Sequence, residues 1–325
     1  MENKKTGRLV GLDALRLIAA FLVICQHVHN YWGMDVVRPI SRIAVFLFFL
    51  ISGYFLYDED IVQIRGKCYK SIHKLCRISL LAILIYGIEA LCVSMVTNSY
   101  DVFHVGPWKL FVFVTSCTSP FFPYGYHLWF LIALIESLFI IAVISKKRNL
   151  FTYKYSGIVC VLISILGVYA NHYFSAMPML KPILLAMPTI ILGGALRRSK
   201  IHMNIVLVVM LICLFSIVSI CESQYWADNY YYSTIPLSFV LFIMFKELHK
   251  GRILSSLAKT GLKYSLGIYI IHPILIDVFC WCKFEKFEKS AMIINPVSIF
   301  LLSLVIVCAK NSFINFVSKH VIAKN

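Results

Sequence analysis

The chain has 325 residues, of which 60% are hydrophobic and 14% charged, and its mean hydropathy is +0.82. Soluble domains are roughly 45–50% apolar, so this composition excludes an ordinary water-soluble protein and predicts an integral membrane protein. The formal charge of +16 would suit a nucleic-acid partner. However, the basic residues alternate between successive segments, which indicates membrane topology and argues against nucleic acid. Membrane spans take up the length, so we predict one integral membrane domain over residues 1–325.

The first predicted span covers residues 9–29 and contains both Arg16 and His27. An ionisable group in hydrocarbon costs a few kcal/mol, so it must face protein or a water-filled cavity. Eleven residues of helix turn through about 1100° and rise about 16 Å, which places both side chains on one face at two depths. His titrates near neutral pH, so this face suits a polar path with a proton-handling group. The structural alternative is that Arg16 pairs with Asp13, one turn earlier, and His27 hydrogen-bonds a neighbouring helix.

Nine further apolar stretches are long enough, or nearly long enough, to cross a bilayer as helices. They cover residues 41–57, 78–97, 127–145, 156–171, 181–196, 202–221, 234–246, 264–282 and 291–309. The N-terminal stretch before the first span is short and basic and has no cleavage pattern, so we expect the first span to be permanent. The predicted fold is an all-α polytopic membrane bundle with about ten transmembrane helices.

The distribution of basic residues tests this arrangement. With the N-terminus in the cytoplasm, 23 of the 31 lysines and arginines fall in inner segments and 7 in outer segments, and Arg16 lies within the membrane. Positive charge is retained on the cytoplasmic side of membranes. The count therefore predicts a multi-pass protein of the cell membrane with both termini in the cytoplasm. The charged segment Lys283–Lys289 is the one predicted outer stretch that runs against this bias.

Aromatic residues gather in two predicted outer segments, Asn98–Tyr126 and Tyr225–Tyr232. Such rings prefer the headgroup zone, and the alternative is a platform that stacks a sugar or another acceptor. Most of the eleven cysteines lie inside apolar runs, where Cys behaves as a small hydrophobe, and no C-x-x-C pair occurs. We therefore predict no metal and no redox chemistry.

Five short motifs occur in order along the chain. They are Leu12-Asp13-Ala14-Leu15-Arg16 followed after ten residues by His27; Phe48-Phe49-Leu50-Ile51-Ser52-Gly53-Tyr54; His127-Leu128-Trp129-Phe130-Leu131; Leu192-Gly193-Gly194; and Ser265-Leu266-Gly267-Ile268-Tyr269-Ile270-Ile271-His272-Pro273. In this order the sequence resembles the membrane-bound acyltransferase family 3, and the resemblance covers almost the whole chain.

The resemblance implies O-acyl transfer, usually of acetyl, from cytoplasmic acetyl-CoA to a hydroxyl of an extracytoplasmic glycan or small acceptor in a bacterial cell envelope. It implies that His27 is catalytic and that Arg16, next to Asp13, is essential. The basic stretch Arg65–Arg77 would be the first inner loop and would face the coenzyme A phosphates, which need cationic partners. We expect those partners to be Arg65, Lys67, Lys74 and Arg77, and the alternative is that the stretch only sets topology. The closest match to the family's R-x-x-R pair is Lys74-x-x-Arg77.

Four further residues are expected to meet the acceptor or line its cavity: Ser52, His127, Trp129 and His272. Small residues allow close helix packing, so Ser52-Gly53 also suits a packing role. His272 precedes a proline at membrane depth and suits the same polar cavity as His27, or a satisfied structural position. Many family members carry a glutamate five residues after the tryptophan. Here that position is Leu134, and Glu136 follows two residues later.

The residues leave several alternatives open. His27 could act as a base toward the hydroxyl or carry the acyl group itself. An Arg- and His-lined path also suits a transporter of a small polar solute such as serine. The resemblance extends to the membrane module of serine racemases of glycopeptide resistance, so the chain could be such a module of a longer protein. A non-catalytic scaffold is the third reading, and a homo-oligomer is compatible with all three.

Overall fold

The computed structural model describes residues 9–29, 31–97, 125–152, 155–173, 182–199, 201–226, 230–281 and 295–322, and every regular element in these ranges is helical. The first half contains α1 (Val10–His27), α2 (Met34–Ser41), α3 (Ile43–Leu56), α4 (Ile61–Thr97), η2 (Tyr126–Leu128), α6 (Trp129–Ile144) and η3 (Leu150–Thr152). The second half contains α7 (Ser156–Tyr173), η5 (Pro182–Ala186), α8 (Met187–Arg198), α9 (Ile205–Tyr225), α10 (Thr234–Glu247), α11 (Arg252–Trp281) and α13 (Pro296–Ile322). The predicted all-α class is confirmed.

Within the described residues, each of the ten predicted spans overlaps a helix of the structure. Among the described residues, seven helical stretches are long and apolar enough to cross a membrane: α1, α2 with α3, α4, η2 with α6, α7, α9 and α11. The helices α8 and α10 have 12 and 14 residues and fall short of that length. The chain is therefore a multi-pass membrane protein, and the number ten stays a prediction.

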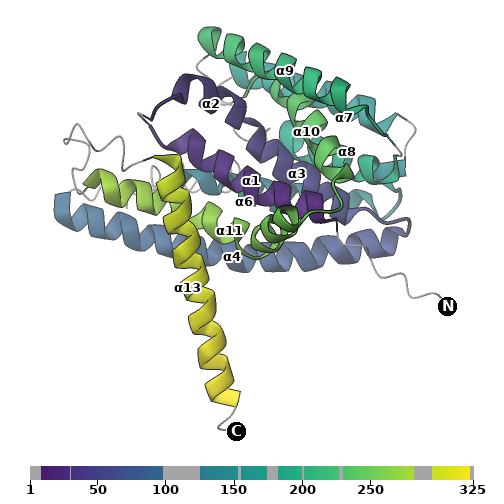
Figure 1. Ribbon diagram of the computed structural model, residues 1–325. Helices are drawn as coiled ribbons and strands as arrows, with labels where there is room; N and C mark the ends of the chain where they lie inside the picture. Colours follow the sequence, from purple (N-terminus) through teal and green to yellow (C-terminus); the bar gives the residue numbers. More distant parts are fainter. Residues whose placement is uncertain are drawn as a thin grey trace. The chain divides into compact units, whose positions relative to one another are not determined.

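The predicted first inner loop, Arg65–Arg77, is not a loop. It forms the first half of α4, a continuous helix of 37 residues that Figure 1 shows as one rod. Lys67, Lys70, Lys74 and Arg77 are spaced by three or four residues, so they line one face of this helix. The sequence-based expectation was wrong because a polar stretch beside a span can extend the span's helix. Basic residues are good helix formers, and the stretch contains no proline.

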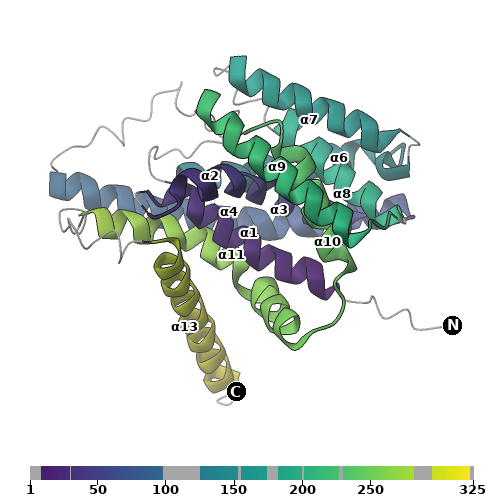
Figure 2. The same cartoon turned by 45° about the horizontal axis from the view of Figure 1, so that its top comes forward.

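The chain divides into two compact units. The first unit joins residues 1–44 to residues 244–325, and the second contains residues 45–243. In the first unit, α1 packs along α11, and both contact α13 (Figures 1 and 2). In the second unit, α4 packs on α6 and α7 packs on α8. Two motifs of the first unit, the one in α1 and the one in α11, are thereby placed side by side.

Two glycine motifs of the second unit pack against each other. A Cβ at Gly53 of α3 would lie 1.8 Å from the carbonyl oxygen of Ile190 in α8, and a Cβ at Gly193 would lie 2.1 Å from that of Leu50. Only glycine allows backbones to approach this closely. The Ser52 hydroxyl donates a hydrogen bond of 2.7 Å to the carbonyl of Phe48, one turn back in its own helix. The predicted close helix packing at Ser52-Gly53 is confirmed.

We predict that Gly53→Ala destabilises the protein strongly. Overpacking usually costs about 1–3 kcal/mol, and the clash here is with backbone, which cannot rotate away. Gly66→Ala is the matched control, because nothing lies within 4 Å of a Cβ at that helical position. Alanine should stabilise position 66 by up to about 1 kcal/mol. Thermal unfolding of both variants in detergent measures this, and equal melting temperatures would contradict the packing account.

Candidate active site

The helices α1 and α11 hold the candidate site of the first unit, and they run in the same direction. A Cβ at Gly261 of α11 would lie 2.2 Å from the Asp13 carbonyl oxygen, so the two backbones nearly touch there. Further along both helices, the rings of His27 and His272 stack with centroids 5.4 Å apart. Two spans that run in the same direction across a membrane need an odd number of spans between them. The sequence predicts seven spans between α1 and α11, which agrees with this requirement.

The ion pair at one end of α1 joins Arg16 to Asp13. The Arg16 Nη1 atom lies 3.0 Å from Asp13 Oδ1, and the two side chains are 22% and 3% exposed. A buried carboxylate needs such a partner, and the pairing is the one that the structural alternative describes. The exposed part of the Arg16 guanidinium still allows contact with a ligand, because arginine has five N–H donors. The geometry therefore supports both a structural and a binding role for Arg16.

The histidine pair lies near the other end of α1. The rings of His27 and His272 are tilted by only 26°, and His272 is fully buried. The His272 Nδ1 atom lies 3.2 Å from the carbonyl oxygen of Ile268, which assigns the donor hydrogen to Nδ1 in the neutral ring. His27 is half-buried, whereas His29, two residues on, is exposed. His27 is therefore the more accessible of the two stacked rings.

Two hydrogen bonds fix the end of α1 where His27 lies. The Gln26 side-chain amide donates to the carbonyl of Ser41 at the end of α2, at 2.8 Å. The Tyr31 hydroxyl donates to the carbonyl of Cys25 at 3.1 Å. Both bonds satisfy polar groups at a helix end, which would otherwise be costly to bury. They also fix the backbone at the end of α1 that carries His27.

Arg38 and Arg42 are residues of this site that the sequence reasoning missed. Both are close enough to act electrostatically on the His27 ring, and Arg42 is only 8% exposed. The sequence reasoning counted them only as outer charges. The available signal was their spacing of four residues, which places both on one face of a helix directly before a span. Two cations beside a proton-accepting ring create a field that favours negative charge.

A second buried polar pair lies between α4 and η2 in the second unit. The Tyr86 hydroxyl and the His127 Nε2 atom are 3.2 Å apart, and these residues are 0% and 2% exposed. Glu89, one turn further along α4, is 7% exposed and was missed. The signal that could have found Glu89 was a carboxylate within an apolar stretch of the sequence. The predicted acceptor residue Trp129 packs edge-on against Tyr230, with centroids 6.1 Å apart, and is partly buried.

The predicted aromatic platform is described only in part. The outer loop lies outside the described residues up to residue 124, as does the segment Lys283–Lys289. In the second aromatic segment, Tyr225 is 84% exposed, whereas Tyr230 and Tyr231 are each 4% exposed and belong to the core. Among the described residues, no group of three or more His, Cys, Asp or Glu side chains is placed to hold a metal ion.

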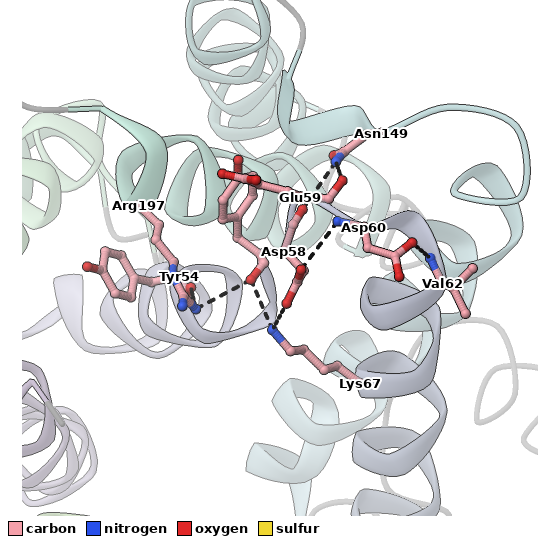
Figure 3. Close-up of polar contacts among 9 residues, drawn as sticks. Tyr54, Asp58, Glu59, Asp60, Val62, Lys67, Asn149 and Arg197 are labelled. Atoms are coloured by element: carbon pink, nitrogen blue, oxygen red, sulfur yellow. Dashed lines mark hydrogen bonds and ion pairs between the residues drawn. The ribbon is translucent and has the colours of Figure 1, made fainter. Parts of the chain in front are cut away.

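The predicted coenzyme A residues have different surroundings in the structure. The Lys67 ammonium lies 3.0 Å from Asp58 Oδ2 and donates to the Tyr57 carbonyl, also at 3.0 Å. Figure 3 shows Lys67 at the turn between α3 and α4, where Arg197 Nη1 also donates to the Tyr57 carbonyl at 3.3 Å. Lys67 thus ties this turn together. Arg65 is half-buried, while Lys74 and Arg77 are exposed and available to an anion.

Comparison with known proteins fits this arrangement. Residues 9–310 match the acyltransferase domain that defines acyltransferase family 3. The chain belongs to this family. A serine/alanine racemase from Enterococcus gallinarum is 31% identical over 145 residues, a stretch that covers 42% of this chain and 18% of the racemase. No solved structure matches the chain. The family assignment makes the chain a membrane acyltransferase in general terms, with an acyl donor as its co-substrate.

We predict that the tie between Lys67 and Asp58 weakens in acid. The hydrogen bond from Lys67 is the main reason that the pKa of Asp58 lies below its usual value of about 3.9. The contact between Lys67 and Asp58 therefore stabilises the fold fully above the usual pKa of Asp58. This contribution is lost as the pH falls through the lowered pKa of Asp58 in the folded protein. Asp58→Asn should lower the free energy of unfolding by less than about 1 kcal/mol, because both side chains are 35% exposed.

The measurement is thermal unfolding of the wild type and Asp58→Asn from about pH 7 down to about pH 3. The difference in melting temperature between the wild type and Asp58→Asn should become smaller as the pH falls. Glu59→Gln, at the exposed neighbouring carboxylate, is the control and should show a smaller difference at neutral pH. A difference between wild type and Asp58→Asn that grows in acid would contradict the assignment.

Proposed function

We propose that the chain moves an acetyl group from cytoplasmic acetyl-CoA to a hydroxyl of an extracytoplasmic glycan or small acceptor. The observation that carries the proposal is the stacked pair of His27 and His272 on α1 and α11, in a chain of acyltransferase family 3. A half-buried ring held by a fully buried one suits a base that must meet a substrate while staying oriented.

In the proposed reaction, His27 accepts the proton of the acceptor hydroxyl as its oxygen attacks the thioester carbonyl. The thioester supplies the activated acyl group, and a C–O bond forms as the C–S bond breaks. His27 then returns the proton to the coenzyme A thiolate, so atoms and charge balance. Arg38 and Arg42 would stabilise the negative charge that develops on the carbonyl oxygen. His272 would keep the His27 ring in place through ring stacking.

The donor is expected to bind on the basic side of the protein. Lys70, Lys74 and Arg77 are exposed on one face of α4, and such cations fit the phosphates of coenzyme A. The proposed orientation, with both termini in the cytoplasm, places this face where the donor is available. In the first unit, Asp13 would hold the Arg16 guanidinium in place for contact with a polar group of a substrate.

A transporter of a small polar solute such as serine is the second candidate. The observation in its favour is the 31% identity over 145 residues to a serine/alanine racemase. The matched stretch covers only 18% of that protein, so it does not carry the whole racemase's activity to this chain. Transport needs a polar path but no acyl donor, so the two candidates differ in whether acetyl-CoA is consumed.

We predict that His27→Ala lowers acetyl transfer by about 10²–10⁴-fold, the usual contribution of a general base. The assay follows radiolabelled acetyl-CoA in membranes that contain the protein and asks where the label goes. His249→Ala is the control, because His249 is exposed between α10 and α11 and should leave transfer unchanged. Full activity of a folded His27→Ala variant would refute the proposal. Serine uptake into proteoliposomes without consumption of acetyl-CoA would favour the transporter instead.

We predict that Arg42→Gln lowers kcat by about 10²–10³-fold with a smaller change in KM, as expected for loss of one oxyanion-stabilising group. Arg42→Lys keeps the charge and should recover part of kcat. The control is Arg252→Gln, because Arg252 is exposed at the start of α11. An effect of Arg42→Gln on KM alone would assign Arg42 to acceptor binding and contradict the oxyanion role.

A further inference from the structure

The second unit contains a cavity of about 660 Å³ that no step of the proposed reaction uses. It lies between the start of α7 and the end of α8. Its lining includes Gly157 and Leu162 of α7, Leu192 and Leu196 of α8, and Phe239 of α10. A volume of this size is typical of small-molecule sites, and the wall is largely apolar.

The polar groups of the cavity lie at one end. Ser156 begins α7, and Arg198 and Ser199 end α8, so all three lie where these packed helices meet the basic inner segments. The Arg198 Nη1 atom donates to the Thr152 carbonyl at 2.8 Å, which uses one of five N–H donors and fixes the guanidinium at the rim. No carboxylate is among the lining residues. The cavity is therefore amphiphilic, with its positive charge at one end.

The face of α7 beside the cavity is strongly apolar and exposed. Ile158 is 64% exposed and Leu162 is 60% exposed, and both also line the cavity. In a multi-pass membrane protein such a face is covered by lipid. A molecule that enters along this face therefore comes from the bilayer.

We propose that this cavity binds an anionic phospholipid of the cytoplasmic leaflet, with an acyl chain against Leu162 and Leu192 and the phosphate at Arg198. The charge supports this occupant, because Lys146, Lys147 and Arg197 lie, like Arg198, in segments that the sequence predicts to be cytoplasmic. Basic pockets between membrane helices on the cytoplasmic side bind anionic headgroups in this way. The proposal depends on the membrane orientation and not on the acyl-transfer chemistry.

The test is native mass spectrometry of the full chain, delipidated in detergent and offered equal amounts of phosphatidylglycerol and phosphatidylcholine with the same acyl chains. The wild type should bind phosphatidylglycerol about fivefold more, the preference expected for one basic residue near the headgroup. Arg198→Gln should remove this preference. Arg148→Gln removes one charge from an exposed position outside the cavity lining and should change the preference less than twofold.

A second pair of variants tests the cavity itself. A Cβ at Gly157 meets only Leu192 Cδ1, at 3.8 Å, so Gly157→Leu should fold and fill the cavity. Gly66→Leu adds the same side chain at a helical position with open space and is the control. Gly157→Leu should abolish retention of the phospholipid, and Gly66→Leu should not. If Gly157→Leu melts early, Leu162→Trp fills the cavity from an exposed position.

Three results would overturn the proposal. Equal binding of the two phospholipids by the wild type would remove the headgroup role of Arg198. Unchanged lipid retention in both Gly157→Leu and Leu162→Trp would place the lipid elsewhere. Displacement of phosphatidylglycerol by long-chain acyl-CoA, at equal concentration and only in variants with an open cavity, would assign the cavity to the acyl donor. In the first two cases acetyl transfer by Gly157→Leu would continue, whereas a cavity that holds the acyl donor would lose transfer in Gly157→Leu. Failure of the lipid proposal is therefore distinguishable from failure of the proposed function.

Discussion

The candidate site depends on the close packing of α1 against α11. The two backbones meet at Gly261, where any larger residue would collide with the Asp13 carbonyl. At the start of α1, Gly11 approaches the carbonyl of Phe245, at the end of α10, just as closely. This packing removes Asp13 and His272 from lipid. A charge or an imidazole within the bilayer is tolerated only in such an interior position. The glycines therefore do more than fill space, because without them these polar groups would face hydrocarbon.

The two polar pairs of these helices lie at opposite ends of α1. The ion pair of Arg16 with Asp13 lies near the start of α1, and the pair of His27 with His272 lies at its end. Neither pair depends on water for its partner, since each is made by residues of the first unit. Each ionisable group of these pairs therefore has a neighbouring side chain as its partner inside the protein.

Much of this could be predicted from the sequence. The shared face of Arg16 and His27 follows from helical periodicity alone, and each predicted span overlaps a helix within the described residues. The pairing of Gly53 with Ile190, and of His27 with His272, could not be predicted, because the partners lie far apart in the chain and periodicity carries no such information. Arg42 was assigned to an outer segment because its burial depends on how α2 packs against α1. Lys67 was assigned to coenzyme A because its contact with Asp58 depends on the turn between α3 and α4.

The motifs of the family divide into two kinds when they are placed in the structure. The motif ending at Gly53 and the motif containing Gly193 meet each other, and both are explained by backbone packing. The motifs around His27 and around His272 meet as well, but they bring together groups that can exchange protons. A resemblance carried by all of these motifs therefore supports the fold more broadly than it supports the chemistry.

The two histidines differ in burial and in hydrogen bonding. His272 is fully buried, and its Nδ1 atom is engaged by the Ile268 carbonyl of its own helix, so it suits a fixed support. His27 is half-buried at the end of α1, where the bonds of Gln26 and Tyr31 hold the backbone in place. A base must reach its substrate, whereas a support must not move, so this difference in burial fits the roles proposed for the two rings. In the proposed reaction an incoming hydroxyl would meet His27 first, close to the charges of Arg38 and Arg42.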